Sequence, residues 1–230
     1  MTRRKPGARI EEEFLAYKDS LRANLLEFTR RAFKMLTMIE KPAILDVGCG
    51  SGVATLELAR LSGGRIIGID TNPACLTRLR SEIRRAGLSG RVEAKERSMF
   101  GLDFPDGSFD IIWAEGAIAV IGFARGLKEW SRLLKSGGYL VVHDDLKGLG
   151  DKLEIVPRRG YELIGHFTMD ENIWWAEYYG PLRRKLDEMR SGYPGDPWVA
   201  EILKDDQRQI DGFKKNKARY RSVFFVLRKN

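Results

Sequence analysis

The chain has 230 residues, of which 43% are hydrophobic and 31% are charged. These proportions are typical of a soluble globular protein, and no apolar run approaches the roughly 20 residues of a membrane span. The two cysteines predict neither a disulfide framework nor paired zinc ligands, so we expect a cytoplasmic protein of one domain without a metal site.

The net charge of +8 is distributed unevenly. Residues 1–43 contain 10 Lys and Arg against 6 Asp and Glu, whereas residues 44–150 contain 14 against 13. A nearly neutral predicted core argues against nucleic acid as a partner. The basic N-terminus is followed by Glu11, Glu12 and Glu13, so a secretory signal is not expected.

Apolar residues recur every three or four positions from Ile10 to Ile39, the spacing of an amphipathic helix. Asp19 or Ser20 is a candidate cap for a second segment, so the pattern predicts a short helix followed by a longer one. Most of these apolar side chains are expected to pack against the domain. A helix before the first strand could also cover a ligand site, and Tyr17 is the candidate for facing inward.

The stretch from Ile44 to Gly52 reads Ile-Leu-Asp-Val-Gly-Cys-Gly-Ser-Gly and predicts a buried strand followed by a glycine loop. Helical periodicity begins at Val53 and ends at the glycine pair Gly63 and Gly64. Strand, glycine loop and helix in this order are typical of a nucleotide-binding unit.

The glycine spacing indicates which nucleotide is bound. The glycines fall at Gly48, Gly50 and Gly52, whereas the dinucleotide fingerprint Gly-x-Gly-x-x-Gly packs a pyrophosphate on a helix N-terminus. Asp46, at the strand end, would repel a pyrophosphate but can accept hydrogen bonds from an ammonium group. The ligand is therefore predicted to carry an amino acid where a dinucleotide carries phosphates.

These residues resemble motif I of the class I S-adenosylmethionine-dependent methyltransferases. The resemblance implies that S-adenosylmethionine is the cofactor and that this loop binds it. Asp70, about 20 residues further on, ends the predicted strand Ile66–Ile69, where an acid holds the ribose hydroxyls. Thr71 adjoins it in the expected cofactor site. The alternative is that Asp70 caps the helix that begins at Pro73.

A helix is predicted after Asn72, with Asn72 as its cap and Gly87 at its end, followed by a strand near Arg91–Lys95. The loop that begins at Ser98 and Met99 runs beside the adenine in this family. Family members often have Asp at the first position; Ser98 departs from that pattern but keeps a hydroxyl acceptor. Met99 is expected to supply backbone contacts and an apolar wall, although it could equally fill the core.

Two more candidates end predicted strands. Glu115 follows the strand Phe109–Trp113, and ligands of open α/β sheets lie at carboxyl ends beside the switch point. The alternatives are a helix-start or solvated carboxylate. His143 follows the strand Tyr139–Val142 and is the best-placed general base, because its ordinary pKa is near neutral. A packing or capping histidine is the competing interpretation.

The last third predicts a strand at Tyr161–Phe167, a helix capped by Asp170, and a final strand at Ser222–Leu227. Four aromatic residues on the capped helix spread over two faces, more than one core-facing stripe needs. One pair is expected to pack in the core and the other to cap a substrate cavity. The expected substrate-binding residues are Tyr17, Trp174, Trp175 and Tyr178.

The order of elements resembles the small-molecule methyltransferases of ubiquinone and menaquinone biosynthesis. The resemblance implies an α/β, Rossmann-like doubly wound sheet of seven strands, mostly parallel, with the last strand antiparallel between the fifth and sixth. One methyltransferase domain would span 1–230: a helical segment or lid (1–40), a cofactor-binding core (42–145) and a substrate-side half (146–230).

The expected function is methyl transfer to a small molecule by in-line displacement, with oligomeric state left open. An RNA or protein methyltransferase is the second interpretation, favoured only by the basic ends of the chain. The Asn-Pro-Pro-Tyr type signature of nucleic-acid amino-methylating enzymes is replaced by Ala114-Glu115-Gly116. A non-catalytic S-adenosylmethionine-binding module is the third.

Overall fold

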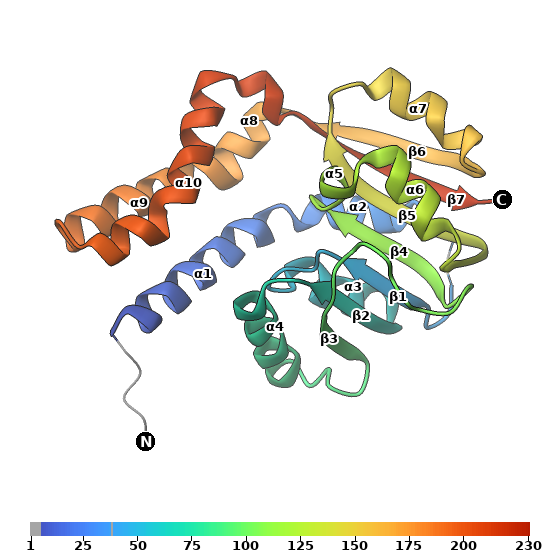
Figure 1. Cartoon of the computed structure of the whole chain (residues 1–230), viewed down its shortest axis with the longest axis horizontal. Coiled ribbons are helices and arrows are strands. Elements are labelled where there is room, and N and C mark those ends of the chain that lie inside the picture. The colour runs from blue at the N-terminus through green and yellow to red at the C-terminus, as the bar shows by residue number, and fades with distance from the viewer. Residues whose placement is uncertain (1–5, 38) are drawn as a thin grey trace. The chain divides into compact units, whose positions relative to one another are not determined.

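The computed structural model describes residues 6–37 and 39–230, with side chains from Arg9 onward (Figure 1). The chain divides into two compact units. The sheet unit comprises Leu26–Thr168 and Ser222–Asn230, and the helical unit comprises the chain up to Leu25 with Met169–Arg221. The boundary between them therefore falls inside the segment 1–40.

A seven-stranded sheet forms the centre of the sheet unit, with strand order β3-β2-β1-β4-β5-β7-β6. β1 pairs in parallel with β2 and β4, β2 with β3, and β4 with β5, whereas β7 runs antiparallel to β5. The order confirms the predicted Rossmann-like α/β fold with the last strand between the fifth and sixth. The strands are β1 Ala43–Val47, β2 Arg65–Asp70, β3 Val92–Glu96, β4 Phe109–Glu115, β5 Leu134–Asp145, β6 Tyr161–Met169 and β7 Ser222–Lys229.

Alternating strand residues separate the two faces of the sheet. On one face, Ile112 and Ala114 of β4 belong to a buried core with α5 (Ile118–Ile121), α6 (Phe123–Ser131) and α7 (Leu149–Arg158). On the other face, Trp113 lies 6.4 Å from the ring of Phe33 in α2 (Leu26–Lys34). The helices α3 (Val53–Ser62) and α4 (Pro73–Arg85) follow β1 and β2.

Local signals placed these elements well. Asn72 caps α4 as predicted: its Oδ1 accepts hydrogen bonds from the backbone N–H groups of Ala74 and Cys75. Gly63 closes α3 in the left-handed conformation.

β5 is longer than predicted because it already begins at Leu134. Its register against β4 shifts between the pairs Phe109–Leu134 and Ile111–Tyr139, so an irregular turn is absorbed into the strand.

The prediction of a short helix followed by a longer one was wrong. α1 runs from Pro6 to Asn24 and the shorter α2 follows from Leu26. Neither proposed cap acts as one, because both side chains form bonds inside α1. Ser20 Oγ donates to Tyr17 O at 2.7 Å, and Asp19 accepts from Arg22 at 3.3 Å.

The helical unit has its own apolar core, which includes Phe14, Leu182, Leu203 and Phe213. In Figure 1, α9 and α10 lie side by side within this unit. A π-helical segment stands between α8 and α9, where a regular helix was expected. The elements of the helical unit are α1, α8 Glu171–Trp174, the π-helix Trp175–Tyr179, α9 Gly180–Gly192, α10 Pro197–Lys215 and the 3₁₀ helix Lys217–Tyr220.

Among the residues that the structure describes, no helix has both the length and the apolar character that crossing a membrane requires.

Candidate functional site

The glycine loop after β1 has two kinds of glycine. A Cβ on Gly48 would lie 2.5 Å from Ala117 Cβ, and one on Gly52 would lie 2.1 Å from Leu79 Cδ1. These two glycines therefore let the loop pack between the start of α5 and α4. Gly50 has a φ of +53°, and a Cβ there would meet nothing within 4 Å. Its backbone borders open space, which leaves room for a ligand.

Asp70 connects this loop to the turn after β2. Its Oδ2 accepts a 2.9 Å hydrogen bond from Gly50 N, and its Oδ1 accepts one of 2.8 Å from Asn72 N. Asn72 is the residue that caps α4. The alternative interpretation, in which Asp70 caps this helix, is therefore wrong. Each carboxylate oxygen retains a lone pair for a further donor. Thr71, the next residue, is exposed.

Asp46, at the end of β1, is 2% exposed. The pKa of its carboxyl group is raised to about 7, mainly by burial, and the nearby charges of Glu115 and Asp70 contribute to the same shift. A 2.6 Å hydrogen bond from Thr55 Oγ1 to Asp46 Oδ2 acts in the opposite direction. Thr55 was missed by sequence reasoning, although a polar residue within the buried stripe of α3 was a usable signal.

Glu115 ends β4 and is held by two donors on one oxygen. Thr29 Oγ1 donates to its Oε1 at 2.8 Å, and Trp113 Nε1 donates to the same atom at 2.7 Å. Burial raises the pKa of the Glu115 carboxyl group. Among the residues that the structure describes, both donors act on Oε1, which leaves Oε2 for a ligand. The sequence analysis allowed a helix before the first strand to cover the site, but it named Tyr17 as the inward-facing residue and missed Thr29.

Asp46, Asp70 and Glu115 thus form an acidic cluster at the carboxyl ends of the neighbouring strands β1, β2 and β4. No basic residue among those described contributes to the pKa shift of Asp46 or Glu115. Partly dehydrated carboxylates without a cationic partner are costly, and a positively charged ligand relieves that cost.

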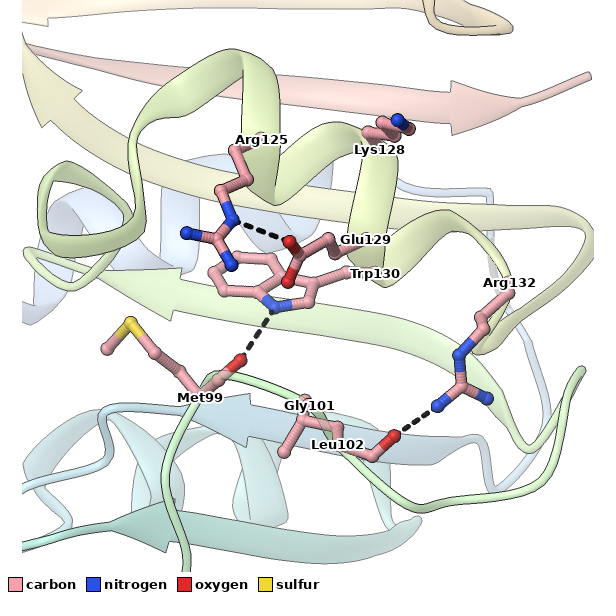
Figure 2. Close-up of a pocket in the computed structure, with 8 residues that line it drawn as sticks. All are labelled: Met99, Gly101, Leu102, Arg125, Lys128, Glu129, Trp130 and Arg132. Carbon is pink, nitrogen blue, oxygen red and sulfur yellow. Dashed lines mark hydrogen bonds and ion pairs between the residues drawn. The ribbon is translucent and has the colours of Figure 1, made fainter.

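The loop after β3 carries the other two predicted contacts. Ser98 is exposed, and its Oγ accepts a 3.2 Å hydrogen bond from Phe100 N. Met99 packs its side chain against the core, and its carbonyl accepts a 3.4 Å hydrogen bond from Trp130 Nε1. Figure 2 shows this bond at the edge of a cleft of about 410 Å³ between the loop and α6.

His143 of β5 pairs in register with Glu115 of β4, so the two side chains project from the same face of the sheet. Its ring stacks on Phe224 of β7 with centroids 4.5 Å apart. Burial lowers the pKa of His143 to about 4, so the ring is neutral near pH 7. The next two residues, Asp144 and Asp145, form ion pairs with Lys152. The general-base role of His143 stays a prediction.

The four predicted substrate residues lie in the helical unit. Tyr17 donates its hydroxyl to Pro181 O at 3.3 Å. Trp175 stacks on Phe213 with centroids 5.4 Å apart, whereas Trp174 lies 6.2 Å from the ring of Tyr178. The π-helical turn brings Trp174 equally close to Tyr179, which the expected spacing of four residues does not anticipate. Their role in substrate binding stays a prediction.

No group of three or more His, Cys, Asp and Glu side chains among the described residues is arranged to hold a metal ion.

Residues 44–138, which span the glycine loop and the acidic cluster, match the family model described as a methyltransferase domain. This stretch is a class I methyltransferase domain. A sterol 24-C-methyltransferase of Neurospora crassa is 33% identical over 199 residues, which cover 74% of this chain and 52% of that protein. The 27-O-demethylrifamycin SV methyltransferase of Amycolatopsis mediterranei is 27% identical over 165 residues, covering 67% and 61%.

The chain thus spans less than two thirds of the length of these curated relatives. For a sterol 24-C-methyltransferase of Eremothecium gossypii, the 102 aligned residues are 33% identical and cover 44% of this chain but only 27% of the relative.

Solved structures share the fold of this methyltransferase domain and of most of the chain. A Geobacter sulfurreducens methyltransferase in complex with S-adenosylhomocysteine superposes with a TM-score of 0.72 at 18% identity, covering 90% of each chain. The cyclase SpnF superposes with a TM-score of 0.75 at 21% identity, covering 88% of this chain and 80% of its own. Because a cyclase shares the fold, the fold alone does not determine the reaction.

The methyltransferase domain has residues that fit its family's cofactor, S-adenosylmethionine. This molecule carries an ammonium group and a sulfonium, and the acidic cluster offers carboxylates to both cations. Gly50 presents its backbone to open space, as close approach of a ligand requires.

Proposed function

We propose that this chain binds S-adenosylmethionine at the acidic cluster and glycine loop and transfers its methyl group to a small-molecule acceptor by in-line displacement. The observation that carries the proposal is the buried acid Asp46 beside Glu115, neither with a basic contributor among the described residues. A cationic amino-acid moiety complements these charges, whereas a pyrophosphate would be repelled by them.

The proposed roles follow the positions of the residues. Asp46 and Glu115 face the cationic groups, the remaining lone pairs of Asp70 accept from the ribose hydroxyls, and Thr71 lies beside them. Ser98 and Met99 border the adenine through the loop after β3. The bound cofactor supplies a methyl group on a sulfonium that leaves as a neutral thioether, so the leaving group needs no acid.

The chain's remaining task is to orient an acceptor and exclude water. A base is required only for an acceptor that loses a proton. His143 is proposed for that role, because its neutral ring lies next to Glu115 in the register of β4 and β5. Its pKa of about 4 makes it a weak base, so a proton would pass to it only transiently.

The acceptor is proposed to be a small molecule, because the relatives that share the domain include proteins named for sterol and rifamycin methylation. The finer assignment to the ubiquinone and menaquinone type rests on the order of elements in the sequence. In the same way, Tyr17, Trp174, Trp175 and Tyr178 are proposed to contribute to acceptor binding. A cytoplasmic location is proposed from the composition.

Calorimetry with S-adenosylhomocysteine tests the cofactor half of the proposal. We expect binding by the parent chain, no tighter binding of NAD, and weaker binding by Asp70→Ala. That variant loses paired charge-assisted hydrogen bonds, worth roughly 2–4 kcal/mol. Tighter binding of NAD than of S-adenosylhomocysteine would overturn the proposal.

Transfer itself is tested with methyl-labelled cofactor offered separately to small-molecule extract, RNA and protein. Label in the small-molecule fraction supports the proposal. Label in RNA or protein would favour the second interpretation. Binding without transfer to any fraction would favour the third interpretation, a non-catalytic S-adenosylmethionine-binding module.

A further inference from the structure

Arg132, the first residue after α6, forms hydrogen bonds with four residues of the loop between β3 and β4. Figure 2 shows its bond to Leu102. Its guanidinium donates from Nη1 to Phe104 O at 2.8 Å and to Asp106 Oδ1 at 2.7 Å, and from Nη2 to Leu102 O. Its own backbone carbonyl accepts a 2.9 Å hydrogen bond from Gly107 N. One residue therefore contacts four positions between Leu102 and Gly107, in the second half of the loop.

The chemistry of this grip requires arginine. A guanidinium presents its donors in a rigid planar fork, so it can reach several carbonyl oxygens at fixed angles, whereas a lysine ammonium is a compact point charge. The Arg132 side chain is 44% exposed and that of Asp106 is 76% exposed, so their ion pair alone contributes little to stability. The carbonyl bonds to Leu102 and Phe104 are what fix the backbone.

The first half of the same loop is also held by a residue near the end of α6. Trp130, in the last turn of α6, is 1% exposed and donates to Met99 O. The carbonyls of Met99, Leu102 and Phe104 are thus all engaged by the end of α6. The hydroxyl of Ser98 takes no part in these bonds. Residues 97–108 have no regular secondary structure of their own, so their conformation depends on such side-chain contacts.

We propose that Arg132 is a positioning residue of the cofactor site, which holds the loop from Ser98 to Gly107 in the conformation that receives the adenosyl group. This inference rests on the proposed function, because the loop is the part of the site assigned to the adenine. Arg132 acts through the loop backbone and touches no reacting atom.

The test compares Arg132→Lys and Arg132→Gln with two control variants. Lys128→Ala changes an exposed cation that lines the same cleft, and Asp106→Asn removes the charge of the ion pair while leaving the carbonyl bonds. Three quantities are measured for each: amide hydrogen exchange of residues 98–107, the Kd for S-adenosylhomocysteine, and the melting temperature.

We expect both Arg132 variants to exchange faster in residues 98–107 and to bind S-adenosylhomocysteine about tenfold more weakly, with a melting temperature near that of the parent. The same factor is expected for 5′-methylthioadenosine, because the loop acts on the adenosyl half. Lys128→Ala and Asp106→Asn should resemble the parent in all three quantities. If Arg132→Gln does not fold, Arg132→Lys decides the outcome.

Unchanged exchange in the loop, or faster exchange with unchanged affinity, overturns the inference while leaving the proposed function standing. A parent chain that binds no S-adenosylhomocysteine overturns the proposed function, and the role of Arg132 in the cofactor site with it. A fall in melting temperature that matches the loss of affinity, with exchange raised throughout the sheet unit, shows a general structural role and also overturns the inference.

Discussion

Thr29 and Glu115, which are 86 positions apart in the sequence, are joined by a 2.8 Å hydrogen bond from the threonine hydroxyl to Oε1. Thr29 is 1% exposed, and the bond fixes a carboxylate of the acidic cluster to α2. The same helix is tied to α3 by a 2.6 Å ion pair between Arg30 and Glu57. α2 is therefore part of the wall of the candidate site within the sheet unit.

Thr29→Val keeps the shape of the side chain and removes its donor. We expect a loss of about 1–2 kcal/mol in the free energy of unfolding, because Glu115 loses one of two donors in a buried setting. The affinity for S-adenosylhomocysteine should also fall, since the carboxylate is less well oriented. Urea unfolding and calorimetry measure the two effects. Thr77→Val, at an exposed position on α4, is the control. If both variants lose the same unfolding free energy and the same affinity, the bond from Thr29 to Glu115 has no particular role in the site.

Asp46 should make stability depend on pH between about 4 and 7. Its pKa is about 7 in the folded chain against an ordinary 3.8, so the folded state retains a proton that the unfolded state releases in this range. Its contribution favours folding most below about pH 4 and is lost as the pH rises through 7. Asp46→Asn should remove this dependence.

The measurement for Asp46 is the free energy of unfolding of parent and variant at several pH values. The free energy of unfolding of Asp46→Asn should increase relative to that of the parent as the pH rises from 4 to 7. A constant difference across that range would show that the Asp46 carboxyl group does not titrate there. Because a cationic ligand favours the ionised acid, ligand binding near pH 7 should also release a proton, seen as a buffer-dependent heat.

His143 should give the stability of the folded chain the opposite pH dependence from that of Asp46. Its pKa is about 4 in the folded chain against an ordinary 6.5, so the unfolded state takes up a proton first as the pH falls. Stability from the neutral ring is present above about pH 6.5 and is lost as the pH falls toward 4. His143→Phe, which keeps a ring against Phe224, should abolish that acid-side loss in thermal unfolding.

The catalytic prediction for His143 uses the same variant. Turnover of an acceptor that must lose a proton should slow, while the Kd for S-adenosylhomocysteine stays near that of the parent. If turnover is unchanged, orientation alone accounts for transfer and the histidine serves the packing of β5 against β7.

Trp175 should be the structural member of the aromatic group in the helical unit. It stacks on Phe213, which is fully buried, and Tyr179 lies 4.9 Å from the same ring. Trp175→Ala should therefore cost at least about 2 kcal/mol of unfolding free energy. Trp174→Ala should cost less and is the variant in which to look for weakened acceptor binding. Trp198→Ala, at a 37% exposed position, is the control for losing a surface indole.

The sequence was sufficient for features that neighbouring residues determine. The strand before Gly48, the cap at Asn72 and the antiparallel last strand all follow from local apolar patterns, capping chemistry or resemblance to a family. Asp46, Asp70 and Glu115 could be nominated because each ends a predicted strand, and parallel strands deliver their carboxyl ends to one edge of a sheet.

What could not be predicted depends on contacts between distant segments. Thr29 and Arg132 matter through partners that lie far away in the sequence or on an irregular loop, and no periodicity reports such contacts. The break at Leu25 was misplaced because polar residues inside a helix resemble caps until their actual partners are known. The π-helical turn at Trp175–Tyr179 changes which aromatic rings meet, and the expected spacing of four residues does not foresee it.

The acidic cluster also bears on how the site empties after each reaction. On the proposed function, the cofactor enters with a positive sulfur and leaves with a neutral one, so the carboxylates of Asp46 and Glu115 hold the spent molecule less strongly than a fresh one. The site would discriminate between the two by charge, with little change in shape. We therefore expect the affinity for S-adenosylmethionine, relative to that for S-adenosylhomocysteine, to increase as the pH rises through 7 and Asp46 becomes fully ionised.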